Sequence, residues 1–427
     1  MSPLVQRVVA AFGAHSYGQA INILTQLASL PLFLTVWDPA TYGGWLILTA
    51  MPAYLTMSDG GLVTAAANEI SIAYTKNDWT LTNRVFQSTF AFVSIVCASI
   101  LAVAWIAIFC FDIPGIESQD KRIALICLAT GILIAQFNGL AETIFRAAGN
   151  HALGIFLGNT ARLIEWSGWI IGLFIFKTFA GVAATGLAFR AAGFLITLAL
   201  SIRLKSGIHW GFAFARKQQI RALISPAASF MSFTLSNALS IQGVTLLVGH
   251  LLGPTSVTIF NTYRTISRVA LLITSTLGNS VWAEFSRLYA NGGMELVKPL
   301  FQRASRISIG ASIGLSAILM FTSPILLKYW SRNHIEFTPV LMALMLGYAA
   351  VAGTWNVARV FLMAINSHQN LSRIALLGAC GTLTICYVLG SHFDLNGIAT
   401  GLVIVESLMA FICIRAAMQK LGSQSLK

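Results

Sequence analysis

Twelve long apolar runs, separated by short polar breaks, account for most of this 427-residue sequence. The hydrocarbon core of a bilayer is about 30 Å thick, so a helix needs roughly twenty mostly apolar residues to cross it. Runs of this length differ from the short alternating segments of a membrane β-barrel. The sequence therefore predicts an all-α integral membrane protein. Its predicted transmembrane helices are residues 9–36, 41–62, 86–111, 123–146, 153–177, 179–203, 221–251, 256–285, 302–327, 337–365, 371–391 and 396–418.

The scarcity of charge supports this class. Only 10% of the residues are Asp, Glu, Lys or Arg, compared with roughly a quarter in an average soluble protein. Such a chain cannot cover a water-exposed surface, and its high apolar content excludes a disordered chain. The sequence has no phosphate-binding loop ending in GK[ST] and no HExxH zinc motif. Because no large polar segment could house a catalytic site, we expect no enzymatic activity, no cofactor and no bound metal.

The Lys and Arg residues between the spans fall mostly on one side. With the N-terminus inside, seventeen of them lie on the inner side and five lie in the outer loops. Since basic residues concentrate in cytoplasmic loops, both termini are predicted to be cytoplasmic. Anionic lipid headgroups then account for the net charge of +13 without a nucleic-acid partner.

The longest inner loop, residues 204–220, is basic and also contains three aromatic residues. This mixture is typical of a segment that lies at the headgroup surface. We expect it to link an N-terminal bundle, residues 1–203, to a C-terminal bundle, residues 221–427.

The two halves of the chain resemble each other at a nearly constant offset. The tetrapeptide Ala-Thr-Gly-Leu occurs at residues 184–187 and again at 399–402, and Asn138 corresponds to Asn356. Because each half holds six predicted spans, an even number, both halves enter the membrane in the same direction. The predicted architecture is two parallel-repeat bundles with a central cavity between them.

Five arginines fall within the predicted spans, and the same spans contain three glutamates besides Glu284, which lies near a span end. Each central arginine costs roughly 2.5–3.5 kcal/mol to insert, so five exposed to lipid would cost on the order of 12–18 kcal/mol. We therefore expect them to face the protein interior or water, as candidate binding residues for an anion. The arginines are Arg162, Arg190, Arg264, Arg268 and Arg359, and the glutamates are Glu142, Glu165 and Glu406.

The eighth span carries the most informative cluster. Asn261, Arg264, Thr265 and Arg268 share one face of the predicted helix. Two guanidinium groups one turn apart repel each other unless an anion lies near them, and their planar fork fits a phosphate. No acidic residue occurs nearby in the sequence. The pattern favours an anion site in the cavity, with contacts to a carboxylate or a backbone carbonyl as the alternative.

Other polar residues within the spans have two interpretations each. Arg162 and Glu165, three residues apart, are expected to form an ion pair. Glu142 and Glu406 are candidates for ion coupling, with an arginine partner as the alternative. Amides and hydroxyls can line a cavity for sugars, although the same groups also pack helices together. The candidate lining residues are Gln19, Asn22, Asn138, Asn261 and Thr265.

Short patches of the sequence resemble bacterial polysaccharide transporters. In the first half these are PLFL at 31–34, YGGW at 42–45 and SDGGL at 58–62. In the second half the likeness covers residues 239–268, which end in YRTISR. They are similar to the O-antigen and lipopolysaccharide-biosynthesis flippases of the multidrug/oligosaccharidyl-lipid/polysaccharide exporter superfamily. The likeness in layout covers essentially the whole chain, and the motifs are moderately specific.

The resemblance implies a flippase that moves an undecaprenyl-pyrophosphate-linked oligosaccharide from the cytoplasmic to the periplasmic leaflet by alternating access. Arg264 and Arg268 would then provide the cationic site of this family. The implied location is the bacterial inner membrane. The expected partners are the lipid-linked oligosaccharide and membrane lipids, with a polysaccharide polymerase and a chain-length regulator as further candidates.

Three other functions stay open. A multidrug or organic-cation antiporter of the same superfamily should offer acidic residues to its substrate, yet residues 8–37 contain none. A membrane-bound glycan transferase or polymerase would need a catalytic cluster in a large outer loop, and the outer loops here are short. A scaffold that transports nothing would tolerate the substitution Arg264→Glu.

Overall fold

The structure is a computed structural model, and every regular element in the residues that it describes is a helix. Those residues are 3–111, 115–204, 206–365 and 369–422.

The chain divides into two compact units. Unit 1 consists of Met1–Trp37 and Leu48–Leu235, and unit 2 consists of Asp38–Ile47 and Ser236–Lys427. The division therefore falls further along the chain than the predicted linker at residues 204–220. A short early segment also belongs to the second unit, which the sequence did not predict.

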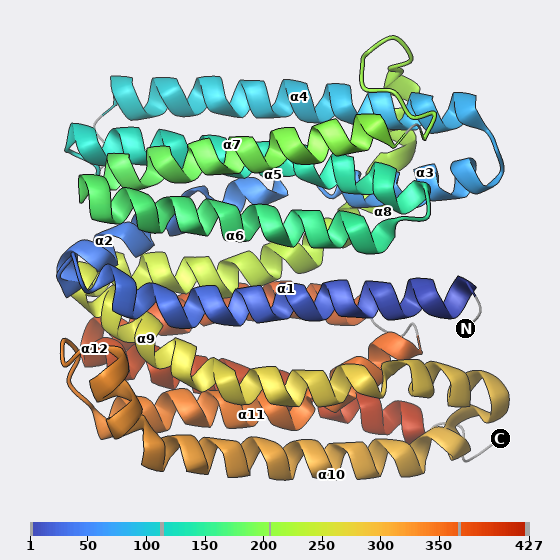
Figure 1. Ribbon diagram of the computed structural model, residues 1–427. Coiled ribbons are helices and arrows are strands. Elements are labelled where there is room, and N and C mark those ends of the chain that lie inside the picture. Colours follow the sequence, from blue (N-terminus) through green and yellow to red (C-terminus); the bar gives the residue numbers. More distant parts are fainter. Residues whose placement is uncertain (1–2, 112–114, 205, 366–368, 423–427) are drawn as a thin grey trace. The chain divides into compact units, whose positions relative to one another are not determined.

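Long helices lie side by side in unit 1 (Figure 1). The helix α6 packs against α1, α5 and α7, and α4 packs against α3 and α5. The elements are α1 (Pro3–Phe33), the 3₁₀ helix η1 (Pro52–Met57), α3 (Leu62–Thr75), α4 (Trp79–Cys110), α5 (Gln119–Ala147), α6 (His151–Phe176) and α7 (Phe179–Arg203). Two further helices, α2 (Pro39–Ala50) and α8 (Lys217–Ala238), each contribute residues to both units.

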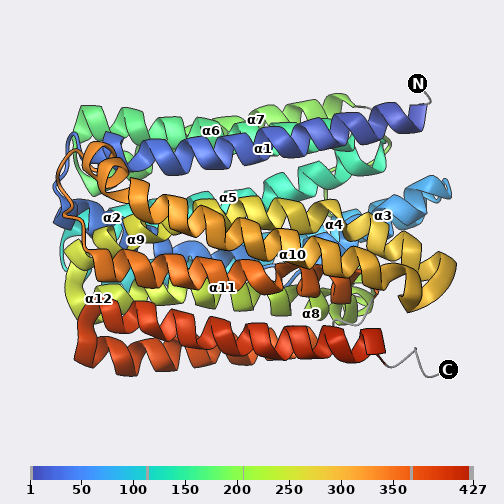
Figure 2. The ribbon, with the colours of Figure 1, turned by 90° about the horizontal axis from the view of Figure 1, so that it is seen from below.

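In unit 2, α11 contacts α9, α10 and α12, which run beside it (Figure 2). A short π-helical turn precedes them and continues directly into α9. The elements are η2 (Leu239–Gly243), α9 (Val244–Ser280), α10 (Trp282–Trp330), α11 (Pro339–Ala364) and α12 (Gln369–Gly422).

Each predicted span is largely helical in the described residues, although the second, seventh and eighth run over more than one element. Seven of these helices are by themselves long and apolar enough to cross a bilayer, or eight if α2, η1 and α3 are counted as one bent span. Two long helices contain a break, at Gly253 with φ +81° in α9 and at Asp394 with φ +52° in α12. Each of them therefore holds parts of two successive spans.

The predicted second span, residues 41–62, is not one continuous helix. It bends by 42° between η1 and α3. Pro52 has no amide proton to continue the helical hydrogen bonds of α2, and Gly60 and Gly61 both adopt positive φ angles. The carboxylate of Asp59 accepts hydrogen bonds from two amides of the bend, so the interrupted backbone is satisfied locally.

The repeated Ala-Thr-Gly-Leu motif occupies equivalent places in the two units. Gly186 faces Trp169 of the preceding helix so closely that a Cβ would lie 2.0 Å from the indole ring. Gly401, the equivalent residue, faces Cys386 across the break in α12, where a Cβ would lie 3.0 Å from the sulfur. In both units the repeat therefore preserves a close approach between the last two spans.

The early segment of unit 2 packs against the break in α9. The Thr258 hydroxyl donates a hydrogen bond of 2.7 Å to the carbonyl oxygen of Pro39. A Cβ on Gly43 would lie only 1.8 Å from the carbonyl oxygen of Pro254. The backbones of Gly43 and Pro254 are in direct contact, so there is no space for a methyl group between them.

We predict that Gly43→Ala lowers the free energy of unfolding by about 1–3 kcal/mol, because the added methyl group forces the two backbones apart. Thermal unfolding of the purified protein in detergent would measure this loss. The control is Gly310→Ala in α10, where a Cβ would meet nothing within 4 Å. A gain of up to about 1 kcal/mol is expected there from helix propensity alone. Equal stability of the two variants would contradict the close approach.

Candidate functional site

The first arginine of α9 is held by neutral groups of unit 2. Arg264 donates hydrogen bonds to the carbonyl oxygen of Ile241 at 2.9 Å and to the Thr245 hydroxyl at 2.8 Å. It also donates to the side-chain oxygen of Asn261, and it lies over the Phe260 ring, 5.2 Å from the centroid. Ile241 belongs to the π-helical turn η2, a type of irregularity that is frequent at functional sites.

None of these three acceptors carries a charge, so they leave the positive charge of Arg264 uncompensated. Among the residues that the structure describes, no carboxylate forms an ion pair with it. Arg268 is exposed one turn later and lies close enough for mutual repulsion. Tyr348 of α11 lies within electrostatic reach of both arginines.

A second group of polar residues joins α11 to α12. Arg359 donates to the side-chain oxygen of Asn356 at 2.8 Å and lies 5.7 Å from the centre of the Trp355 ring. The Trp355 indole donates to Glu406 at 2.8 Å, and Arg359 attracts the same carboxylate electrostatically. Tyr348 also lies near Glu406, which connects this group to the arginines of α9. Unit 2 thus brings together three of the predicted arginines and one glutamate.

In unit 1, a direct ion pair joins α6 to α7. It is formed by Glu165 and Arg190, whose side chains are only 15% and 12% exposed. The predicted pair of Arg162 with Glu165 is therefore wrong, since Arg162 is exposed and acts on Glu165 only at longer range. The two helices pack closely here, since a Cβ on Gly168 of α6 would lie 2.9 Å from Phe189 of α7. This close approach brings Arg190, the residue after Phe189, within reach of Glu165.

Glu142 of α5 lies at the centre of a second cluster in unit 1. Arg162, Arg146 and His15 are all within electrostatic reach of its carboxylate. The rings of His15 and His151 lie edge to face, with their centroids 6.5 Å apart. The Nδ1 atom of His151 is buried and has no hydrogen-bond partner among the described residues. One carboxylate thus lies near two guanidinium groups and the His15 imidazole, and His15 in turn contacts the His151 ring.

The candidate lining residues have unlike surroundings. On α1, Gln19 is exposed and Asn22 is half-buried, whereas the side-chain oxygen of Asn138 on α5 is buried without a partner in the described part of the chain. Asn261 and Thr265 use their side chains for hydrogen bonds within α9. A hollow of about 560 Å³ along α1 is lined by apolar residues, namely Ala20, Ile23, Leu24, Leu27 and Ala28.

The sequence did not predict the side chains that hold these charges in place. Thr245, Tyr348 and Trp355 lie in apolar runs, where hydroxyl and indole groups are ordinary packing residues and give no signal. Asn356 did have a signal, because it repeats Asn138 in the other half of the chain. Its amide donates to the carbonyl oxygen of Thr274 at 3.0 Å and so ties α11 to α9.

One pattern typical of hydrolases, G-x-S-x-G, occurs at residues 310–314. It lies inside α10, where Ser312 donates to the carbonyl oxygen of Ala350 at 2.9 Å. One turn earlier, Ser308 donates to the carbonyl oxygen of Gly353 at 2.8 Å. A nucleophile elbow requires a strand-to-helix turn, so this motif serves helix packing.

No family model and no curated protein matches the sequence. Solved structures do match the fold. An inward-facing multidrug resistance MATE family transporter of the MOP superfamily has a TM-score of 0.78 at 11% identity, over 95% of each chain. An outward-facing MATE transporter has a TM-score of 0.65 at 12% identity, over 99% of this chain and 96% of the other.

A third match is a MOP superfamily transporter from Pyrococcus furiosus, described as having a binding pocket of reverse polarity that suggests a different function. Its TM-score is 0.65 at 12% identity, over 98% of this chain and 96% of the other. At such low identity the likeness concerns the fold alone. The chain has the fold of the MATE transporters, which consists of twelve transmembrane helices in two bundles.

We predict that Glu165→Gln destabilises unit 1 by about 3–5 kcal/mol, because it leaves the largely buried Arg190 without its carboxylate. Thermal or denaturant unfolding in detergent would measure the loss, and the double variant with Arg190→Gln should recover most of it. The matched control is Glu284→Gln, which breaks the exposed pair with Arg287 and should cost less than about 1 kcal/mol. A similar loss in both single variants would argue against a special role for the buried pair.

Proposed function

We propose that this protein is a transporter that flips a lipid-linked oligosaccharide across the membrane by alternating access, in lipopolysaccharide or exopolysaccharide biosynthesis. The pyrophosphate of the substrate binds at the arginines of unit 2, while its lipid tail stays in the bilayer. The proposed location is the bacterial inner membrane, with both termini cytoplasmic. This orientation is supported by the excess of basic residues on one side of the predicted topology.

The observation that carries the proposal is the uncompensated charge of Arg264. Its hydrogen bonds to Ile241, Thr245 and Asn261 orient the guanidinium but add no negative charge. A charge held within a transmembrane helix is costly and typically marks a substrate or ion pathway. Arg268, one turn away, adds a second positive charge of the kind that a pyrophosphate could neutralise.

The charge balance of the two units supports an anionic substrate. Apart from Glu284 near a span end, the predicted spans of unit 2 contain one glutamate, Glu406, and three of the five arginines, namely Arg264, Arg268 and Arg359. In unit 1, Arg190 already neutralises Glu165, so Glu142 faces the charges of two other arginines. Within the described residues both units therefore favour an anion over an organic cation.

The fold supports alternating access. Two of the solved structures that share it are described as inward-facing and outward-facing conformations of MATE transporters. The transporter with a binding pocket of reverse polarity is described as suggesting a different function. Within one fold, the polarity of the interior therefore distinguishes an anionic from a cationic substrate.

The second candidate function is multidrug export, and the shared fold favours it equally. A cationic drug would need an available carboxylate. Glu142 and Glu406 are the candidates in the described residues, and each lies within reach of an arginine. The charge balance therefore favours the anionic substrate.

We predict that Arg264→Gln combined with Arg268→Gln lowers the translocation of a pyrophosphate-linked oligosaccharide at least roughly tenfold, because charge-assisted hydrogen bonds to the phosphates are lost. Proteoliposomes with a labelled lipid-linked sugar would measure this rate. Arg306→Gln, which removes an exposed charge of the same unit, serves as the control. Undiminished sugar transport in the double variant, or gradient-driven efflux of a cationic dye by the unaltered protein, would favour the second function.

We further predict that Glu142 couples transport to an ion gradient, because its carboxylate lies near His15, whose ring contacts that of His151, and imidazoles can relay a proton. Glu142→Gln should abolish the acceleration of transport by an imposed pH or sodium gradient and leave gradient-free exchange largely intact. Glu406→Gln is the comparison, since its carboxylate accepts a hydrogen bond from Trp355 and has no described imidazole neighbour. If gradient dependence survives Glu142→Gln and disappears in Glu406→Gln, the coupling residue is Glu406 of unit 2.

A further inference from the structure

The segment that follows α7, residues 206–216, packs against α4 within unit 1. Asn83 of α4 donates to a carbonyl oxygen of this segment at 2.9 Å and accepts from the amide of His209 at 2.9 Å. Gln87, one turn later, donates to the carbonyl oxygen of His209 at 3.0 Å and accepts from the amide of Phe214 at 2.7 Å. The predicted interfacial linker is therefore held in place by two buried amide side chains.

Aromatic contacts with α4 hold the same segment in place. Trp210 packs edge to face against Phe86 and Phe90, with centroid distances of 5.0 and 5.3 Å, and its indole donates to Ser201 at 3.1 Å. Phe212 stacks on Phe90 at 4.9 Å. These contacts fix which side chains of the segment point outward.

The outward side chains are aromatic and basic. Phe212 and Phe214 are 59% and 44% exposed, although hydrogen bonds hold the backbone beneath them. Arg203, Arg216 and Lys217 are exposed at the two ends of the same segment. Aromatic and basic side chains together are typical of a surface that binds the interface of an anionic bilayer.

The neighbouring charges have the same sign. Lys76 and Arg84 are exposed around the turn from α3 to α4. The acidic residue of that turn, Asp78, caps α4 by accepting a hydrogen bond from the Leu81 amide at 2.9 Å. Residues 203–224 contain no acidic residue at all. The complement of this surface is a layer of negative charge.

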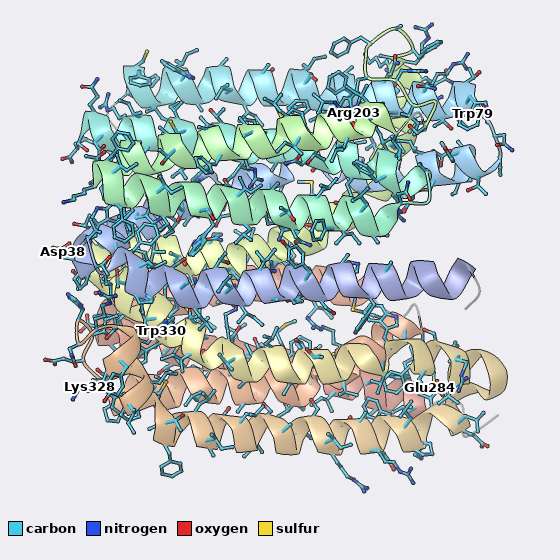
Figure 3. All side chains as sticks on the ribbon, in the orientation of Figure 1. Asp38, Trp79, Arg203, Glu284, Lys328 and Trp330 are labelled. Atoms are coloured by element: carbon cyan, nitrogen blue, oxygen red, sulfur yellow. The ribbon has the colours of Figure 1, made fainter. Side chains whose placement is uncertain are left out.

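This surface also lies near the ends of helices, where lipid headgroups are found. In Figure 1 the segment lies beside the N-terminal part of α4 and the C-terminal end of α7, and the labelled side chains of Trp79 and Arg203 lie in the same region in Figure 3. Since the unit-1 helices cross the bilayer, their ends lie at the depth of the lipid headgroups.

We propose that residues 206–217, with Arg203 beside them, form a docking surface for the anionic phospholipid headgroups of one leaflet. Phe212 and Phe214 insert between the headgroups, and Arg216 and Lys217 contact their phosphates. Because the segment is tied to α4, this contact anchors unit 1 at a fixed depth. The inference does not depend on which substrate the protein transports.

Native mass spectrometry of the full-length protein with phosphatidylglycerol or phosphatidylcholine tests this surface. The unaltered protein should prefer phosphatidylglycerol. Arg216→Gln with Lys217→Gln should lower that preference roughly tenfold or more, and Phe214→Ser should weaken the binding of both lipids. Phe214 is chosen because Phe212, which stacks on Phe90, is then retained and the fold of the segment is kept.

The matched control combines Lys328→Gln with Tyr329→Ser at the C-terminal end of α10, where both residues are exposed; Figure 3 labels Lys328 at that end. It should leave the lipid preference unchanged, and thermal unfolding should show that every variant is folded. Equal binding of the two lipids by the unaltered protein would overturn the proposal. Displacement of phosphatidylglycerol by millimolar inorganic phosphate would overturn it as well, because it would indicate a simple anion site.

Discussion

A polar group in hydrocarbon must find its partner within the protein, and this constraint accounts for most of the structure. Helices satisfy their own backbone groups, which explains why the described elements are all helical. Where a helix is interrupted, nearby groups replace the missing hydrogen bonds. Asp59 does this at the bend after η1, and beside the break in α9 the Thr258 hydroxyl satisfies a carbonyl oxygen of α2.

The same constraint separates two kinds of arginine. Arg190 meets the carboxylate of Glu165, so its charge is balanced inside unit 1. Among the described residues, the hydrogen-bond acceptors of Arg264 are neutral oxygen atoms, which fix its position but do not balance its charge. An arginine of the first kind stabilises helix packing. In the proposed function, an arginine of the second kind binds a negative group of the substrate.

Polar residues at the start of α4 have a related explanation. Asn83 and Gln87 are buried in the polar N-terminal part of α4, and local patterns do not show what they contact. In the structure both residues satisfy the backbone of the segment after α7. The hydrogen bonds hold this segment to unit 1, and they present its aromatic and basic side chains outward.

The length and polarity of the apolar runs were enough to determine the membrane class, the helical content and the approximate spans, because insertion depends on each run by itself. The sequence also predicted which arginines need a partner, since the cost of an isolated charge in the membrane is independent of the fold. Only the tertiary structure decided which partner each arginine has. The rule that favoured Arg162 for Glu165 describes one isolated helix, whereas the observed partner, Arg190, comes from a second helix that packs closely against the first. No local pattern encodes how closely two helices approach, and that approach determines which charges are paired within the protein.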